Sequence, residues 1–259
     1  KTLNLFLAAS AIAIAAAAPV KAQTETSAEA PVATTEVIRV TTQRREQSIT
    51  EVPINLTAYD SERLDILGIT QFDELSDFVP GLEIQEQSPN NPGFVIRGIT
   101  SDSGEATIEP RVAIFQDGVS ISRSRGSYVE LFDMERIEVA KGPQPTLFGR
   151  GALIGGINLI QNKADIDAEG ASGAGSIAFG DFNRFEVEGH VNMPITDTLA
   201  VRFAGINKQR DGYVDNALGG EAFNSVDLWA ARAVVSWEPT DQLRFDLIGN
   251  YQEDTPSGT

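Results

Sequence analysis

Hydrophobic and polar residues alternate along the chain from residue 171 towards the C-terminus. In one stretch, one face holds Phe185, Val187, Gly189, Val191 and Met193, and the other holds Arg184, Glu186, Glu188, His190 and Asn192. A period of two is typical of β-strands with one apolar face. The pattern predicts five strands, at residues 171–180, 184–193, 199–208, 226–237 and 243–251, with Ile248 as an exception to the alternation in the last one.

The connections between these strands differ in length. Residues 194–198 and 239–242 are short turns, whereas residues 211–224 form a longer polar connection. Strands of about ten residues with alternating faces and unequal connections are typical of outer-membrane β-barrels. A soluble β-sandwich also alternates, so the dimensions have to decide between the two.

The fourth predicted strand carries a tryptophan at each end of one face, Trp229 and Trp237. The eight residue steps from one to the other cover about 26 Å at about 3.3 Å each, or about 20 Å of height at a tilt of about 40°, close to the lipid band between aromatic girdles. The polar face would then line an aqueous lumen, where we expect His190 to be solvated. Five strands cannot close a barrel, which needs about eight, so the sheet is either soluble or continues beyond residue 259. The loop-like end at residues 254–259 favours continuation.

Residues 47–163 mix short helical and extended patterns. Asp60 and Ser61 can cap a short helix that Gly68 ends, and residues 70–73 read as a capping box that opens a second helix, ended by Pro80 and Gly81. Strand-like runs lie at residues 94–97, 112–115, 136–139 and 157–160, with a hairpin turn at residues 117–118. The pattern predicts a small α+β domain.

The N-terminal segment is predicted to be a signal peptide. Residues 3–18 form an apolar run of about 16 residues, short of the ~20 that cross a bilayer as a helix, and small residues at 20 and 22 suit cleavage after residue 22. A membrane anchor is the alternative. Residues 23–33 are small and polar, as in a flexible tether. Residues 36–41 are β-branched and extended, and are either an ordinary edge strand or a strand left for another protein to pair with.

Composition excludes several classes of function. With 20 Lys and Arg against 37 Asp and Glu, the net charge of −17 opposes binding to nucleic acid. The absence of cysteine excludes disulfides and thiol chemistry, and the single histidine leaves no basis for a histidine triad. The glycines at 149–156 do not fit a G-x-G-x-x-G loop. We therefore predict no catalytic residue, no metal site, no cofactor and no enzyme.

Several motifs, in order along the chain, resemble the TonB-dependent receptors of the Gram-negative outer membrane. Residues 36–41 (EVIRVT) resemble the TonB box, residues 91–99 (NPGFVIRGI) the I-R-G motif, and residues 112–119 (VAIFQDGV) a strand pair of the plug. The most specific run is residues 131–161, with ERIEV, KGPQ, LFGR and GGIN. Pro145 and the Leu153-Ile154 pair depart from the usual pattern and affect only local turns.

The resemblance implies an α+β plug domain followed by the first antiparallel strands of an incomplete transmembrane β-barrel. The domains would be a signal peptide (1–22), a flexible tether with the TonB box (23–46), the plug (47–165) and the barrel strands (166–259). It further implies import of a scarce ligand, such as a ferric siderophore, across the outer membrane. The partners would be the periplasmic C-terminal domain of TonB, the ligand and outer-membrane lipid, with no nucleic acid. A passive porin or a surface adhesin with an N-terminal domain is the alternative.

The resemblance also assigns roles to residues. We call residues 36–41 the candidate coupling segment, because they would pair with TonB through Glu36, Val37, Ile38, Arg39, Val40 and Thr41. Plug structure would depend on Arg97, Gly98, Asp117, Gly118, Arg136, Glu138, Lys141, Gly142, Pro143, Gly149, Gly155 and Gly156. Arg97 and Lys141 would pair with barrel carboxylates. Loop position alone suggests ligand contacts at Gln87, Asn90, Asn91, Ser101, Asp102 and Arg111.

Overall fold

The computed structural model describes residues 38–41, 47–88, 91–100, 111–121, 129–145 and 151–257. The chain divides into two units, residues 1–36 and 37–259, and every described residue belongs to the second unit. The predicted signal peptide, most of the predicted tether, and residues Glu36 and Val37 therefore lie outside the described residues. None of the described helices has the length and apolarity that a membrane crossing requires.

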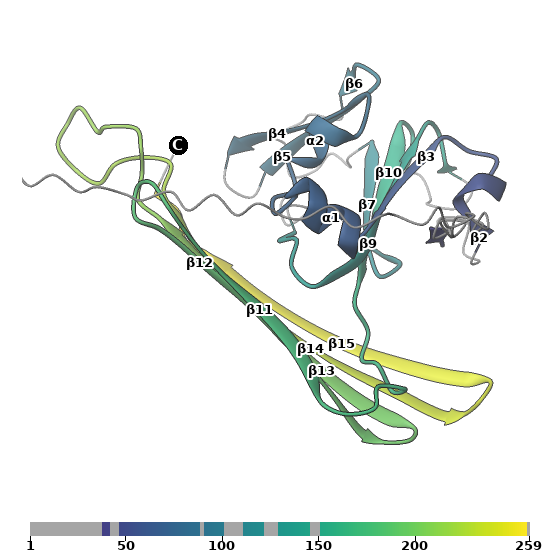
Figure 1. The fold of residues 1–259 in the computed structure, drawn as a ribbon. Helices are drawn as coiled ribbons and strands as arrows, with labels where there is room; N and C mark the ends of the chain where they lie inside the picture. Colours follow the sequence, from purple (N-terminus) through teal and green to yellow (C-terminus); the bar gives the residue numbers. More distant parts are fainter. Residues whose placement is uncertain are drawn as a thin grey trace, which may run out of the picture. The chain divides into compact units, whose positions relative to one another are not determined.

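The C-terminal sheet consists of five long strands, which pair in the order β11-β12-β13-β14-β15, each antiparallel to the next (Figure 1). The strands are β11 (Ser172–Gly180), β12 (Arg184–Thr196), β13 (Leu199–Arg210), β14 (Val226–Thr240) and β15 (Leu243–Asp254). All five predicted strands are confirmed. The sheet is an open sequence of neighbours, with β11 and β15 as its outer strands.

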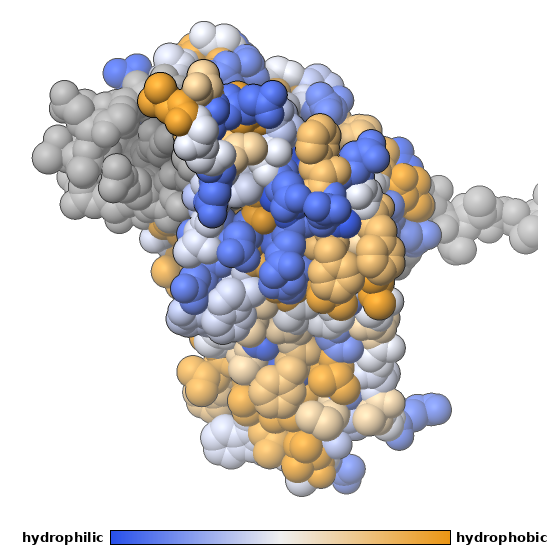
Figure 2. All heavy atoms as spheres, turned by 90° about the vertical axis from the view of Figure 1, so that its left-hand side faces the viewer, coloured by the Kyte–Doolittle hydropathy of each residue, from blue (hydrophilic) through white to orange (hydrophobic). Residues whose placement is uncertain are grey.

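The two faces of the C-terminal sheet carry opposite chemistry. Asn192, Lys208 and Arg232, on one face, are only 1–3% exposed. On the other face, Leu247 is 73% exposed, and Figure 2 shows hydrophobic side chains gathered over this sheet. Other exposed members of that face are Ile177, Phe179, Val187, Val191, Phe203, Trp229, Trp237, Phe245 and Tyr251. The predicted alternation is therefore correct, and it is the polar face that is buried.

Aromatic pairs stand at both ends of the apolar face. The Trp229 and Tyr251 rings lie 4.7 Å apart, and the Trp237 and Phe245 rings lie 5.7 Å apart. Ile248, which breaks the alternation, lies on the polar face and packs against a small cluster that includes Ala164. Ile248 is therefore apolar on the polar face because it packs near Ala164 of the preceding region.

The preceding region, residues 38–165, is α+β as predicted, and we call it the α+β region. Its main sheet has the order β3-β9-β10-β7-β8, in which only the β10–β7 pair is parallel. The strands are β3 (Leu56–Asp60), β7 (Val112–Gln116), β8 (Val119–Ile121), β9 (Met134–Lys141) and β10 (Gly155–Gln161). Ile137, Ile157 and Leu159 on these strands are fully buried and form one core with residues of the helices.

Helix α1 (Ser61–Leu67) begins and ends as predicted. The Asp60 side chain accepts the amide of Arg63, and Gly68 closes the helix with a left-handed φ of 69°. The second prediction needs correction, because α2 covers only Leu75–Phe78. Glu74 accepts the amides of Thr70 and Gln71 with its carboxylate, so these residues form a turn before the helix instead of its first turn.

Smaller elements complete the α+β region. A three-stranded sheet has the order β4-β5-β6, with β4 (Leu82–Ser88), β5 (Asn91–Ile96) and β6 (Ile99–Thr100). Near the start of the chain, β1 (Arg39–Val40) pairs antiparallel with β2 (Gln47–Ser48), and a 3-10 turn, η1 (Ile49–Glu51), follows.

Candidate functional site

The described part of the candidate coupling segment, residues 38–41, already has a partner strand. Arg39 lies opposite Ser48 and Val40 opposite Gln47, and the Ile38 carbonyl accepts the amide of Ile49 at 3.1 Å. Of the two alternatives for this segment, an ordinary edge strand and a strand left for another protein, residues 38–41 form the first, with a partner strand in their own chain. The partner comes only a few residues later in the chain, where the short strand β2 gives little sequence signal.

The same segment is packed onto the main sheet of the α+β region. Val40 is 1% exposed and forms a cluster with Val52 and Ala58. The Thr41 amide donates to a carboxylate oxygen of Glu138, on β9, at 2.8 Å. Two motifs that lie 97 residues apart in sequence thus meet in one contact.

Glu138 is the centre of that contact. Its side chain is fully buried, and the same oxygen, Oε1, accepts from Nε of Arg136 at 2.9 Å. Its other oxygen accepts from Asn158 at 3.3 Å, and Arg136 also donates to the Thr41 hydroxyl at 3.0 Å. A buried carboxylate needs several donors, and one of these is supplied by the candidate coupling segment.

Two predicted plug motifs form tight turns. Arg97 and Gly98 have φ values of 54° and 77° between β5 and β6, and Asp117 and Gly118 have 48° and 79° between β7 and β8. Positive φ at both central residues suits a two-residue hairpin turn and explains the glycines. The Asp117 carboxylate also accepts the amide of Gln161 at 3.1 Å, which ties the hairpin to the end of β10.

The motif at residues 141–143 lies beside the first of these turns. Gly142 has a φ of 119°, and a side chain there would approach Arg97 Nη1 at 3.7 Å, whereas Pro143 is exposed. Lys141 donates to the Pro80 carbonyl at 3.2 Å. Burial, together with the nearby positive charge of Arg97, lowers the pKa of Lys141. The structure thus places two cations close together.

The glycines of β10 have a packing role. A Cβ at Gly155 would lie 2.5 Å from the Ala140 carbonyl oxygen and 2.6 Å from Ile96 Cδ1. Gly156 follows it between the same neighbouring strands, opposite Ala140 and Ala113. Close backbone approach is a general reason for glycine inside a strand. Gly149 lies outside the described residues.

The polar face of the C-terminal sheet contacts the α+β region at Asp133, which has a φ of 49°. Arg202 donates to both oxygens of the Asp133 carboxylate, from Nε at 2.9 Å, and Asn162 donates to one of them at 2.9 Å. The Asp133 amide donates to Glu188 at 3.1 Å. His190 Nδ1 lies 3.8 Å from the same carboxylate. These contacts were not predicted, and His190 faces the α+β region.

A second buried cation holds the neighbouring backbone. Arg232 donates to the carbonyls of Phe132 and Asp133 at 3.0 and 2.9 Å, and its guanidinium lies 4.3 Å from the centre of the Phe132 ring. Nearby, Lys208 pairs with Glu130 and donates to the Thr70 carbonyl at 3.0 Å. Burial raises the pKa of Glu130, and Lys208 opposes that shift. Residues 130–133 are therefore fastened to the sheet.

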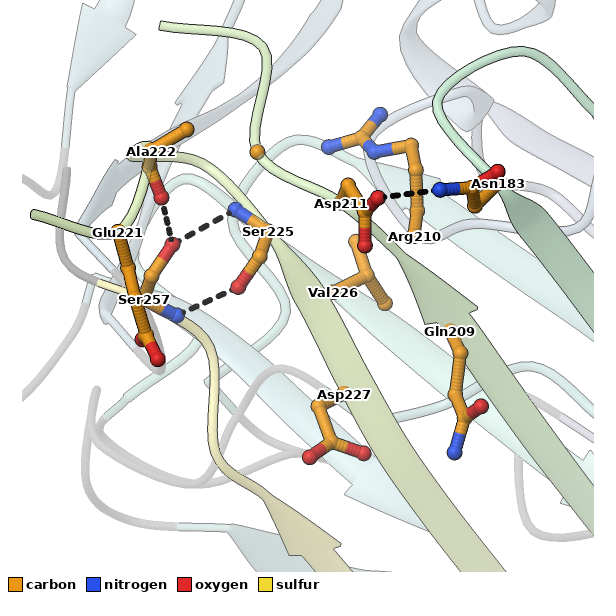
Figure 3. Close-up of a pocket in the computed structure, with 11 residues that line it drawn as sticks. Asn183, Gln209, Arg210, Asp211, Glu221, Ala222, Ser225, Val226, Asp227 and Ser257 are labelled. Carbon is orange, nitrogen blue, oxygen red and sulfur yellow. Dashed lines mark hydrogen bonds between the residues drawn. The ribbon is translucent and has the colours of Figure 1, made fainter. Parts of the chain in front are cut away.

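An open pocket of about 710 Å³ lies at the end of β13 and β14 that carries the long connection, opposite the short turns. Figure 3 shows Ser225 and Ser257 bonded to each other in both directions, with amide-to-side-chain distances of 3.1 and 2.7 Å. Asn183 donates to Asp211 at 2.6 Å on the other side. The lining is polar, and the long connection at residues 211–224 was the sequence feature that could have indicated it.

The predicted ligand contacts are mostly not described. Asn90, Ser101 and Asp102 lie outside the described residues. Gln87 lies near the end of β4 and Asn91 begins β5, and their side chains are not described. Arg111 is exposed, and its carbonyl accepts the amide of Ile154 at 3.1 Å. The ligand contacts therefore stay a prediction. Among the described residues, no group of histidine and acidic side chains could hold a metal ion.

Comparison with known proteins agrees with this architecture. Residues 48–156 match the family described as TonB-dependent Receptor Plug Domain. The pesticin receptor of Yersinia pestis is 29% identical over 185 residues, which cover 70% of this chain and 26% of that protein. The vitamin B12 transporter BtuB of Vibrio vulnificus (strain CMCP6) is 29% identical over 156 residues, which cover 57% of this chain and 24% of that protein.

A solved structure shares the fold. The ferric yersiniabactin uptake receptor FyuA from Yersinia pestis matches with a TM-score of 0.66 at 24% sequence identity, over 77% of this chain and 31% of that chain. The chain spans about a quarter of the length of the curated relatives it matches. The α+β region and the open C-terminal sheet thus have counterparts that lie together in one known protein.

Proposed function

We propose that this chain is the N-terminal part of an outer-membrane transporter, because residues 48–156 match the TonB-dependent Receptor Plug Domain family. It imports a scarce ligand with energy delivered from the inner membrane through TonB, and it is not an enzyme. Under this proposal, residues 1–22 are the export signal and residues 166–259 are the first strands of the barrel wall. The ligand class that we favour is a ferric siderophore, in line with the uptake function named for FyuA.

One observation carries the proposal, namely the inverted C-terminal sheet. It buries Lys208 and Arg232 against the α+β region and exposes a band of apolar side chains on its other face. In an outer-membrane barrel, the outward face is apolar between aromatic girdles and the inward face is polar. A wall of this kind with a globular region on its polar face is the arrangement that a plugged transporter requires.

The pair of cations at Arg97 and Lys141 supports a further part of the proposal. Two like charges held close together raise each other's electrostatic free energy, and a carboxylate nearby relieves it. We infer that carboxylates of barrel strands after residue 259 face this pair. The pocket between residues 211–224 and Ser257 lies at the end of the sheet that would be extracellular, and could contribute to ligand selection.

The test is a proline substitution in the candidate coupling segment of the full-length receptor. Ile38→Pro removes a backbone donor that a strand from TonB would use, so we expect energy-dependent uptake to fall at least about tenfold. Binding of ligand to the cell surface should not change, because residue 38 would lie on the periplasmic side. Uptake and surface binding of a radiolabelled nutrient that restores growth are measured in parallel.

The matched control is Ile38→Ala, which shortens the side chain and keeps the N–H group. Uptake should persist in this variant. Uptake by the Ile38→Pro receptor at the normal rate would refute coupling through this segment. Collapse of the proton gradient separates the alternatives, because a passive porin would continue to admit its solute and an adhesin would import nothing under either condition.

A further inference from the structure

We propose that Glu138 is the positioning residue that holds the candidate coupling segment on the plug, and that its contact with Thr41 must break before residues 38–41 can pair with TonB. This inference rests on the proposed function, because it concerns how the same segment is regulated. The Thr41 amide donates to the carboxylate at 2.8 Å, and the Glu138 side chain has no exposed surface. A hydrogen bond to an ionised acceptor is roughly twice as strong as one between neutral groups.

The contact holds the segment at the residue where its strand ends. Ile38 and Val40 are fixed by β2 and by the cluster with Val52 and Ala58. Thr41 follows β1 directly and donates its amide outside the β1–β2 pairing. A partner strand that pairs with residues 38–41 would need this amide or the backbone beside it, so docking on Glu138 and pairing with TonB compete.

When Thr41 leaves, the Glu138 carboxylate still has hydrogen-bond donors. After Thr41 departs, the Glu138 carboxylate keeps the donors from Arg136 Nε at 2.9 Å and Asn158 Nδ2 at 3.3 Å. An unpaired buried carboxylate would make release very costly. The Arg136 and Asn158 donors therefore lower the free-energy cost of releasing Thr41.

The experiment uses the full-length receptor in detergent without ligand. Glu138→Gln keeps the shape of the side chain and an acceptor oxygen but removes the charge, and its new amide can donate to Asn158 Oδ1, which is buried without a partner in the described structure. We expect hydrogen exchange of the amides at residues 38–41 to rise about tenfold, and affinity for the isolated TonB C-terminal domain to rise by a similar factor. Amides of β9 and β10 should exchange at unchanged rates, which a general loss of structure would not allow.

Glu135→Gln is the matched control. It removes the other carboxylate that contacts Arg136, and within the described residues the carboxylate bonded to Thr41 is that of Glu138, not Glu135. Exchange at residues 38–41 and TonB affinity should stay as in the unaltered receptor. If Glu138→Gln leaves both readouts unchanged in a folded receptor, the proposal is overturned.

A second pair of variants keeps the test decisive if Glu138→Gln does not assemble. Thr41→Ala removes the hydroxyl that donates to Glu138 Oε1 at 3.4 Å and accepts from Arg136 at 3.0 Å, and Thr41→Ser retains it. Exchange should rise about threefold in the alanine variant and return to normal in the serine variant, and equal rates in both would overturn the docking role. Faster exchange without any TonB binding, even by the unaltered receptor with ligand, would support the docking contact and refute the proposed function.

Discussion

The α+β region and the C-terminal sheet are built from similar strands but differ in which side chains they leave exposed, and among the described residues only the sheet buries cations beside apolar residues such as Ile206 and Val234. In the α+β region, most of the fully buried side chains on the main sheet are apolar, such as Ile137 and Leu159, and Glu138 and Gln161 are the buried polar exceptions. In the C-terminal sheet, Lys208 and Arg232 are buried, while Leu247 is 73% exposed. Burying one large apolar side chain contributes about 1.5–3 kcal/mol relative to leaving it in water. An exposed apolar face of this size fits the lipid-facing side of the proposed barrel wall.

The comparison also shows what joins the two regions. Residues 130–133 of the α+β region offer backbone carbonyls and acidic side chains. Arg202, Lys208 and Arg232 of the sheet bond to these groups. Polar networks of this kind stabilise only when each member is satisfied. Under the proposed function, a sheet fastened in this way keeps the α+β region in a fixed position while other contacts of that region change.

The largest effect is expected where the two regions are fastened. Asp133→Ala leaves Arg202 buried without its carboxylate, and removal of one partner of a buried ion pair costs about 3–5 kcal/mol. The side chains of Asp133 and Arg202 are 2% and 12% exposed, so solvent compensates for little of the lost ion pair. Denaturant unfolding of the full-length receptor, followed by amide exchange in the β9 and β10 strands, measures the loss.

Asp167→Ala is the control for that variant, because Asp167 is an exposed carboxylate of the following segment. It should change the free energy of unfolding by less than about 0.5 kcal/mol. If Asp133→Ala changes the free energy of unfolding as little as this control does, the Asp133 contacts do not hold the α+β region and the sheet together.

The next effect concerns the apolar face itself. Ala233 is exposed, midway between Trp229 and Trp237, so Ala233→Arg should cost about 2–4 kcal/mol in a bilayer, where arginine at the midplane is unfavourable. Gln209→Arg is the control, because Gln209 lies on the same face one row beyond Trp229 and should cost about 0–1 kcal/mol. Guanidinium titration of the full-length receptor in lipid vesicles gives both values. Equal and negligible costs would indicate that water, not lipid, covers this face.

The sequence was sufficient for the parts of this comparison that depend on local pattern. Alternation identified both faces of the sheet, and Asp117-Gly118 identified a hairpin, because these signals lie within one strand or one turn. Contacts such as Arg202 with Asp133, which join residues 69 apart, depend on register between distant elements, and no local pattern encodes it. The predicted capping box at Thr70 failed for a local reason. The Glu74 carboxylate accepts the amides of Thr70 and Gln71, so these residues form a turn before the helix and not its first turn.

The smallest effect is expected from adding a methyl group at a glycine, which should destabilise the tightly packed α+β region but not the open face of the sheet. Gly155→Ala places a methyl group 2.5 Å from the Ala140 carbonyl oxygen, which belongs to the backbone and cannot swing aside, so overpacking should cost about 1–3 kcal/mol. Gly249→Ala makes the same chemical change where nothing lies within 4 Å, and it should be neutral or slightly stabilising because the unfolded chain loses freedom. Denaturant unfolding of both variants in the full-length receptor measures the difference. If the two costs are equal, the glycine at 155 is not there for close approach, and strand β10 has more room beside β9 than the fold described here allows.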